Sequence, residues 1–193
     1  YLDDPEFIDR HLLEEIFNEP GLKGIIIRGS GRHFSAGADL TRLKQLAGDE
    51  SALFNKISAG KELVKLIRNA RIPVIAGISG ICFGGGLEIA LACHIRICSE
   101  TALFAFPETN YGIMPGLGGT VMLTKLIGSG RSAGIILSGD MINARKALEL
   151  KMVDYVLPPE ELHDHTAAYL DRLTSDRDTE VIHAVMQSVY NAE

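Results

Sequence analysis

The sequence predicts an α/β fold in which strands and helices alternate along the chain. Short apolar runs at 23–28, 73–78 and 153–157 predict buried strands. Apolar residues at helical spacing predict amphipathic helices over 4–18 and 52–69. Because strands and helices of this kind bury their apolar faces against one another, the alternation indicates a layered α/β architecture.

The remaining elements continue this alternation. The segment 32–40 reads as a strand running into a loop of small residues, and 41–45 begins a helix. Asn143 is a typical N-cap residue for the helix that follows it. Helices are further predicted over 121–127, 132–138, 144–150, 160–173 and 178–190.

Bulk composition narrows the class of protein. A length of 193 residues suits one domain, or one domain with an appendage. The net charge of −6 argues against nucleic-acid binding as the main function. The sequence contains an odd number of cysteines, Cys82, Cys93 and Cys98, and no CxxC pair. We therefore expect them to be small core residues of a protein in a reduced compartment. No stretch of the sequence has the length and apolar character of a membrane span.

The stretch 72–120 is the most informative part of the sequence. An apolar strand leads through Gly80 to the triple glycine 84–86, and a helical pattern follows. Glycines let the backbone approach a ligand closely, and a helix N-terminus presents unpaired N–H groups to negative charge. This stretch therefore predicts a binding site at the start of a helix.

Two carboxylates interrupt this apolar stretch. Glu88 lies just inside the predicted helix, and Glu108 follows Phe106 and Pro107 in a second apolar run. Apolar surroundings disfavour the charged form of a carboxyl group, so its pKa rises toward neutrality and suits acid–base chemistry. Alternatively, Glu88 complements the helix dipole and Glu108 is an acid on a surface loop. Spacing alone leaves both interpretations open.

Other motifs are weaker. The sequence 128–133 fits G-x-G-x-x-A, but a helix precedes it, which argues against a dinucleotide site. His163 and His165 lack the spacing of a helical metal pair and are interpreted as a solvated face. We interpret His33 as structural and His94 as a packed residue of the helix that follows Glu88.

Several motifs, in order along nearly the whole chain, resemble the enoyl-CoA hydratase/isomerase (crotonase) family. No single motif would be specific, but their consistent spacing is. They occupy 34–40 (FSAGADL), 73–80 (PVIAGISG), 84–90 (GGGLEIA), 106–108 (FPE), 112–120 (GIMPGLGGT), 137–140 (LSGD), 144–147 and 153–156.

The resemblance implies a fold and an assembly. It implies a crotonase-like spiral of ββα repeats over 1–157 and a C-terminal helical segment over 158–193 that begins the oligomerisation region. Members of the family usually have a further N-terminal strand pair and further C-terminal helices, so we expect that terminal parts are missing from this chain. A homotrimer or a dimer of trimers is expected, in the cytoplasm or an organelle matrix, with no membrane or nucleic-acid partner.

The resemblance also implies an activity of fatty acid metabolism: hydration of a 2-enoyl-CoA thioester by the carboxylates of Glu88 and Glu108. The backbone N–H groups of Ala38 and Gly85 would form the oxyanion hole. Gly116 would open the next helix toward the thioester. No metal or redox cofactor is implied, and coenzyme A enters only as part of the substrate. The implied substrate-binding residues are Ala36, Ala38, Asp39, Leu40, Thr41, Gly84, Gly85, Pro115 and Gly116.

Two alternatives stay open at this point. One is another family reaction, such as a Δ3,Δ2-enoyl-CoA isomerase or an acyl-CoA hydrolase or decarboxylase. Isomerases of the family can work with one glutamate, so the presence of both favours a hydratase. The other alternative is a non-catalytic or RNA-binding member, which the two glutamates and the net charge of −6 argue against.

Overall fold

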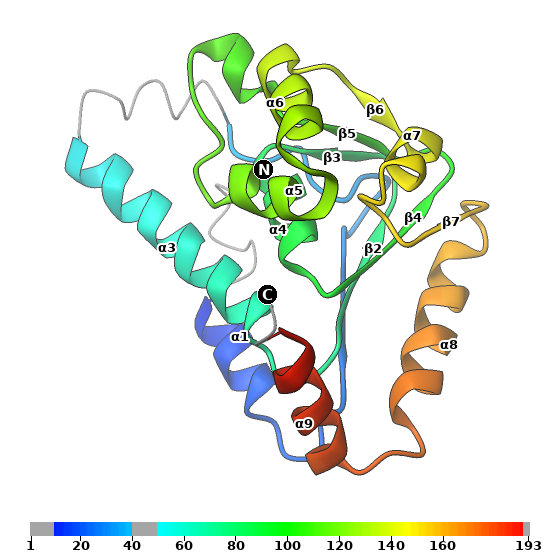
Figure 1. Ribbon diagram of the computed structural model, residues 1–193. Coiled ribbons are helices and arrows are strands. Elements are labelled where there is room, and N and C mark those ends of the chain that lie inside the picture. Colours follow the sequence, from blue (N-terminus) through cyan, green and yellow to red (C-terminus); the bar gives the residue numbers. More distant parts are fainter. Residues whose placement is uncertain (1–9, 40–49, 191–193) are drawn as a thin grey trace.

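The larger of the two sheets is a parallel sheet of four strands. The computed structural model describes residues 10–39 and 50–190. The sheet contains β1 (Ile25–Arg28), β2 (Val74–Ile78), β4 (Ile95–Ser99) and β7 (Tyr155–Leu157), in the order β1-β2-β4-β7. All three neighbouring pairs are parallel. Parallel strands require crossover connections, and helices supply them here (Figure 1).

A second, smaller sheet lies beside the first. It contains β3 (Ile81–Phe83), β5 (Leu103–Ala105) and β6 (Ile142–Asn143), in the order β3-β5-β6. Strand β3 pairs parallel to β5, and β6 is antiparallel to β5. Gly80, at φ +53°, lies between β2 and β3, where the chain passes from one sheet to the other. The chain therefore runs strand, strand, helix in successive units, the arrangement that the resemblance implies for a ββα spiral.

Helices surround the two sheets. Helix α8 contacts β1, β2 and β4, whereas α4 contacts α3 and α5 (Figure 1). The helices are α1 (Arg10–Phe17), α3 (Glu50–Arg68), α4 (Gly85–Ala92), the 3₁₀ helix η1 (Pro107–Tyr111), α5 (Gly119–Ile127), α6 (Ser129–Ser138), α7 (Ala144–Glu149), α8 (Leu162–Thr174) and α9 (Thr179–Tyr190).

Strand β2 is fully buried because both of its faces are covered. Ile75 belongs to a cluster with Ile97 and Leu162 of α8. Val74 and Ile78 belong to the larger cluster, which includes every apolar residue of α4. A strand buried on both faces shows a continuous apolar run, which is the pattern of 73–78.

Most predicted elements are confirmed within one to three residues at their ends. Asn143 accepts a hydrogen bond from Lys146 N at 2.8 Å, as expected of an N-cap. The predicted helix 4–18 is described only from Arg10, and the helix expected at 41–45 lies outside the described residues. Of the described part of the segment 32–40, residues 32–39, only Ser35 forms a bridge, to Cys82.

One expectation about these elements was wrong, and four strands were missed. The helix that follows Glu88 ends at Ala92, with Cys93 as its C-cap in an extended conformation, so His94 precedes β4 and is not helical. His94 is nonetheless packed, with 8% of its surface exposed. Strands β3, β4, β5 and β6 were not predicted, because strands of two to five residues inside an apolar region have no periodicity of their own.

The cysteines agree with the prediction, since all three are free thiols in the buried core. Among the described helices, none combines the length and the apolar character needed to cross a bilayer.

Candidate active site

The N-terminus of α4 is built by a glycine that no other residue could replace without strain. Gly84 precedes the helix with φ 52° and ψ −126°, and its N–H donates to Ala105 O of β5 at 2.9 Å. The first helical hydrogen bond runs from Glu88 N to Gly84 O at 3.0 Å. The N–H groups of Gly85, Gly86 and Leu87 therefore have no carbonyl partner within the helix. Unpaired N–H groups of this kind can donate to a ligand.

The loop of small residues that contains Gly37 packs directly against the start of α4. Ser35 O accepts from Phe83 N at 2.9 Å, which fixes the loop to β3. Gly37 follows with φ +80°, and a Cβ atom there would lie 2.8 Å from Phe83 O and 3.1 Å from Gly85 N. The structure thus brings the segment that contains Ala38 beside Gly85, although about fifty residues separate them in sequence.

Glu88 is buried in the first turn of α4, with 1% of its surface exposed. Its Oε1 accepts from Leu117 N at 2.8 Å and from Gly119 N at 2.7 Å. Gly119 is the first residue of α5, so the carboxylate lies at the positive end of a second helix.

Opposing effects set the pKa of Glu88. Burial disfavours its charged form and raises the pKa to about 7. The N–H groups of Gly119 and Leu117 act in the opposite direction. The negative charge of Glu108 raises this pKa, and the positive charge of Lys61 lowers it. A carboxyl group with a pKa near neutrality can both accept and donate a proton.

Glu108 is the second carboxylate of the site. It lies in the first turn of η1 after Pro107 and has 6% of its surface exposed, so the interpretation as a surface-loop acid was wrong. A Cβ atom on Gly84 would lie 2.7 Å from Glu108 Oε1, which places this carboxyl against the start of α4. Among the described residues, Oε2 has no hydrogen-bond partner. Burial raises the pKa of this group.

The other predicted binding residues divide into three groups. Asp39 and Ala36 belong to the described loop, half-buried and exposed respectively, whereas Leu40 and Thr41 lie outside the described residues. Pro115 is buried and Gly116 is half-buried in the loop before α5.

Gly116 does not open that helix. Helix α5 begins at Gly119, after Gly118 with φ 102°, because a helix requires negative φ at every residue. Its N-terminus faces the carboxylate of Glu88.

Sequence reasoning missed the groups that hold Glu88. Leu117 and Gly119 act through backbone N–H groups, which carry no side-chain signal. The only available signal was the cluster of glycines between 116 and 119. The influence of Lys61 was also missed, because it comes from α3, far from the motif in sequence.

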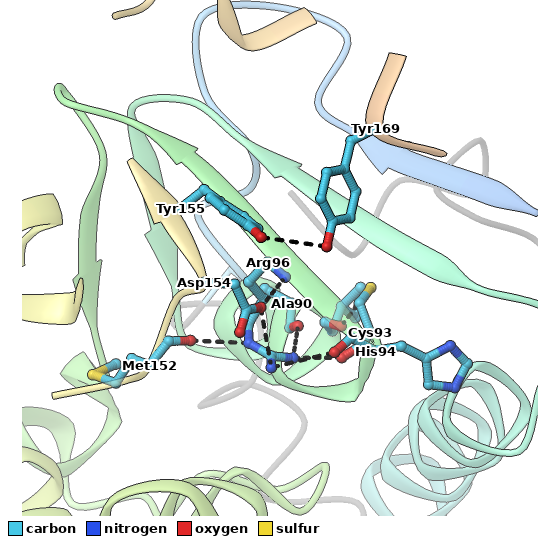
Figure 2. Close-up of polar contacts among 9 residues, drawn as sticks. Ala90, Cys93, His94, Arg96, Met152, Asp154, Tyr155 and Tyr169 are labelled. Carbon is cyan, nitrogen blue, oxygen red and sulfur yellow. Dashed lines mark hydrogen bonds and ion pairs between the residues drawn. The ribbon is translucent and has the colours of Figure 1, made fainter. Parts of the chain in front are cut away.

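The opposite end of α4 is held by a buried guanidinium. Arg96 donates through Nε to Met152 O at 2.9 Å and through Nη1 to Ala90 O at 3.4 Å and to Cys93 O. Its backbone N donates to Asp154 Oδ2 at 2.8 Å. Figure 2 shows the guanidinium between the last carbonyls of α4 and the segment that leads into β7. Arg96 thereby satisfies carbonyls that the end of the helix leaves unpaired.

Within 10–39 and 50–190, no group of three His, Cys, Asp or Glu side chains could hold a metal ion.

Two buried carboxyl groups beside a glycine-lined helix N-terminus can exchange protons with a ligand and stabilise negative charge on it. The comparisons with known proteins agree with this class. The model of the enoyl-CoA hydratase/isomerase family matches residues 6–192. The chain therefore belongs to the enoyl-CoA hydratase/isomerase family.

Curated relatives carry hydratase names. A probable enoyl-CoA hydratase of Bacillus subtilis is 41% identical over 141 residues, which are 73% of this chain and 54% of the relative. A crotonyl-CoA hydratase of Syntrophomonas wolfei is 36% identical over 82% of this chain and 60% of the relative. The chain thus spans little more than half the length of these relatives.

Solved structures share the fold. The enoyl-CoA hydratase of Bacillus anthracis superposes with a TM-score of 0.86 at 33% identity, over 94% of this chain and 69% of that one. DspI of Pseudomonas aeruginosa gives a TM-score of 0.88 at 30% identity, over 95% of this chain and 74% of that one. The α/β architecture predicted from the sequence is therefore confirmed as a crotonase fold.

Proposed function

We propose that the full-length protein is an enoyl-CoA hydratase that adds water syn across the C2=C3 bond of a 2-enoyl-CoA thioester. The burial of both Glu88 and Glu108 at the glycine-lined start of α4 carries this proposal. The hydratase names of the relatives support it.

The backbone N–H groups of Ala38 and Gly85 are proposed to bind the thioester oxygen. The close approach of Gly37 to Gly85 supports this pairing. As water attacks C3, negative charge moves to the thioester oxygen, and these donors stabilise it. One such donor contributes roughly 3 kcal/mol to transition-state stabilisation.

The two carboxyl groups divide the proton transfers. Ionised Glu88 positions a water molecule and takes one of its protons as the oxygen bonds to C3. Protonated Glu108 delivers its proton to C2, which restores the thioester carbonyl. The roles exchange in the reverse direction, when water is eliminated. Glu108 Oε2 has no hydrogen-bond partner among the described residues, and burial raises the pKa of this carboxyl; both features suit a group that enters the reaction protonated.

Substrate contacts are assigned to the loops around these groups. The coenzyme A moiety is proposed to lie along Ala36, Asp39, Leu40 and Thr41. Gly84, Pro115 and Gly116 would lie near the thioester. The reaction requires no metal or redox cofactor, since coenzyme A is part of the substrate.

The assembly is also a proposal. We expect residues 1–157 to form the catalytic spiral and 158–193 to begin the oligomerisation region of a homotrimer or a dimer of trimers, in the cytoplasm or an organelle matrix. Light scattering on the full-length protein tests the oligomeric state. A monomer at working concentrations would contradict it.

Hydration of crotonyl-CoA tests the function. The full-length protein should remove the absorbance of the conjugated enoyl group, and Glu88→Gln and Glu108→Gln should each slow this reaction on the order of 10²-fold or more. Glu100→Gln, at an exposed position, serves as the control. Undiminished activity in both site variants would refute the assigned roles. Activity confined to a 3-enoyl-CoA would indicate an isomerase instead.

A further inference from the structure

One face of α3 packs across the loop that holds Glu88. A Cβ atom on Gly60 would lie 2.5 Å from Leu117 Cδ2 and 3.2 Å from Leu117 Cδ1. One turn earlier, Ile57 lies 3.8 Å from the Cβ position of Gly116. The absence of a side chain at Gly60 therefore lets the helix approach this loop closely.

This loop supplies backbone donors that hold the carboxylate. Leu117 N and Gly119 N donate to the same oxygen, Glu88 Oε1, at 2.8 and 2.7 Å. A displacement of Leu117 would remove one of the two donors directly.

A charged residue of α3 also affects the pKa of Glu88. Lys61 follows Gly60 and is exposed, and its positive charge favours the ionised form of Glu88. Glu108, from η1, acts in the opposite direction. Among the described residues, these are the two charged side chains whose fields act on Glu88.

We propose that Gly60 is a positioning residue for the reaction: it seats Leu117 so that its N–H reaches Glu88. Gly60 itself does not touch the reacting atoms. This inference rests on the proposed role of Glu88 as the base. It adds that α3, an element outside the glutamate motifs, controls the pH range in which that base works.

A side chain at position 60 tests this inference. Alanine can be accommodated by rotation of the flexible Leu117 side chain, whereas the larger methionine must move the Leu117 backbone. Gly60→Met should therefore shift the acid limb of the pH–rate profile upward by about one pH unit, since a charge-assisted hydrogen bond to the ionised form is lost. Gly60→Ala should shift it less. Gly134 of α6, with open space at its Cβ position, provides the controls Gly134→Ala and Gly134→Met.

Titration of the Glu88 carboxyl by isotope-edited infrared spectroscopy separates this inference from the proposed function. Without substrate, the Glu88 carboxyl of Gly60→Met should titrate at higher pH than in the wild type and the controls. This result would support the inference even if crotonyl-CoA were not hydrated. Hydratase activity with an unshifted profile and an unshifted titration in Gly60→Met would overturn the inference and leave the proposed function intact.

Discussion

Glu88 shows how burial and hydrogen bonding compete at a single residue. Burial raises the pKa of its carboxyl to about 7, from a value of 4.5 for an exposed group. Folding therefore favours the protonated form. This contribution to stability is fully present below the pKa of the unfolded chain and is lost as the pH rises through the folded pKa.

Glu88→Gln should consequently gain stability relative to the wild type as the pH rises. A glutamine Oε1 can still accept from Leu117 N and Gly119 N, but it carries no charge to desolvate. The difference between the two proteins should change by on the order of 3 kcal/mol between pH values below 4.5 and above 7. Urea unfolding across this range measures it. Parallel stability curves would show that Glu88 is not desolvated as described.

At Gly84, both the backbone conformation and the contact with Glu108 require a glycine. Gly84→Ala would place a methyl group 2.7 Å from Glu108 Oε1 and would also strain the backbone at φ 52°. We expect the hydration rate to fall about 10²-fold, because small displacements of catalytic groups have effects of that size. Gly21→Ala isolates the strain, since Gly21 has φ 82° and nothing within 4 Å of its Cβ position. Equal effects of both variants on activity would contradict the contact.

At this scale, the sequence singled out Glu88, Glu108 and the triple glycine 84–86 as candidates, because acids and glycines stand out in an apolar stretch, and the family resemblance selected Gly85 among the glycines. It could not reveal that Leu117 and Gly119 hold Glu88. Backbone donors can belong to any residue type, and only the fold decides where they point.

At the scale of elements, α4 is an eight-residue helix fixed at both ends. Its start meets the Gly37 loop and Glu108, and its end meets the guanidinium of Arg96 (Figure 2). A helix this short has little intrinsic stability, so its position depends on tertiary contacts.

Arg96→Met should therefore destabilise the fold by about 3 kcal/mol, since the carbonyls of Met152, Ala90 and Cys93 would lose a buried donor. Arg145→Met is a control, because its ion pair with Glu149 is on the surface and should contribute less than about 1 kcal/mol. Thermal or urea unfolding gives both values. Similar losses in the two variants would argue against the role of Arg96 at the end of α4.

The elements also show where sequence patterns stop being informative. Long amphipathic helices such as α8 and α9 were predicted nearly to the residue, because their apolar faces repeat over several turns. The strands of the smaller sheet contain only two or three residues each. Their pairing depends on the turn at Gly80 and on partners more than twenty residues away, which no local pattern encodes.

At the scale of the whole molecule, two sheets and their helices bring together segments that the sequence keeps apart. The loop at Gly37, the start of α4, the first turn of η1 and the start of α5 meet around two carboxyl groups. The class of fold followed from alternating strands and helices. Their meeting depends on the packing of successive units, because α4 contacts the unit before it through the Gly37 loop and the unit after it through η1 and α5.

The stereochemistry of hydration tests most directly whether Glu88 and Glu108 act together from one side of the substrate. Crotonyl-CoA is hydrated by the full-length protein in ²H₂O, and the product is analysed by NMR for the relative configuration of the deuterium at C2 and the hydroxyl at C3. Two carboxyl groups that share one site should deliver both to the same face and give a single syn diastereomer. An anti product, or a mixture of the two diastereomers, would contradict this arrangement.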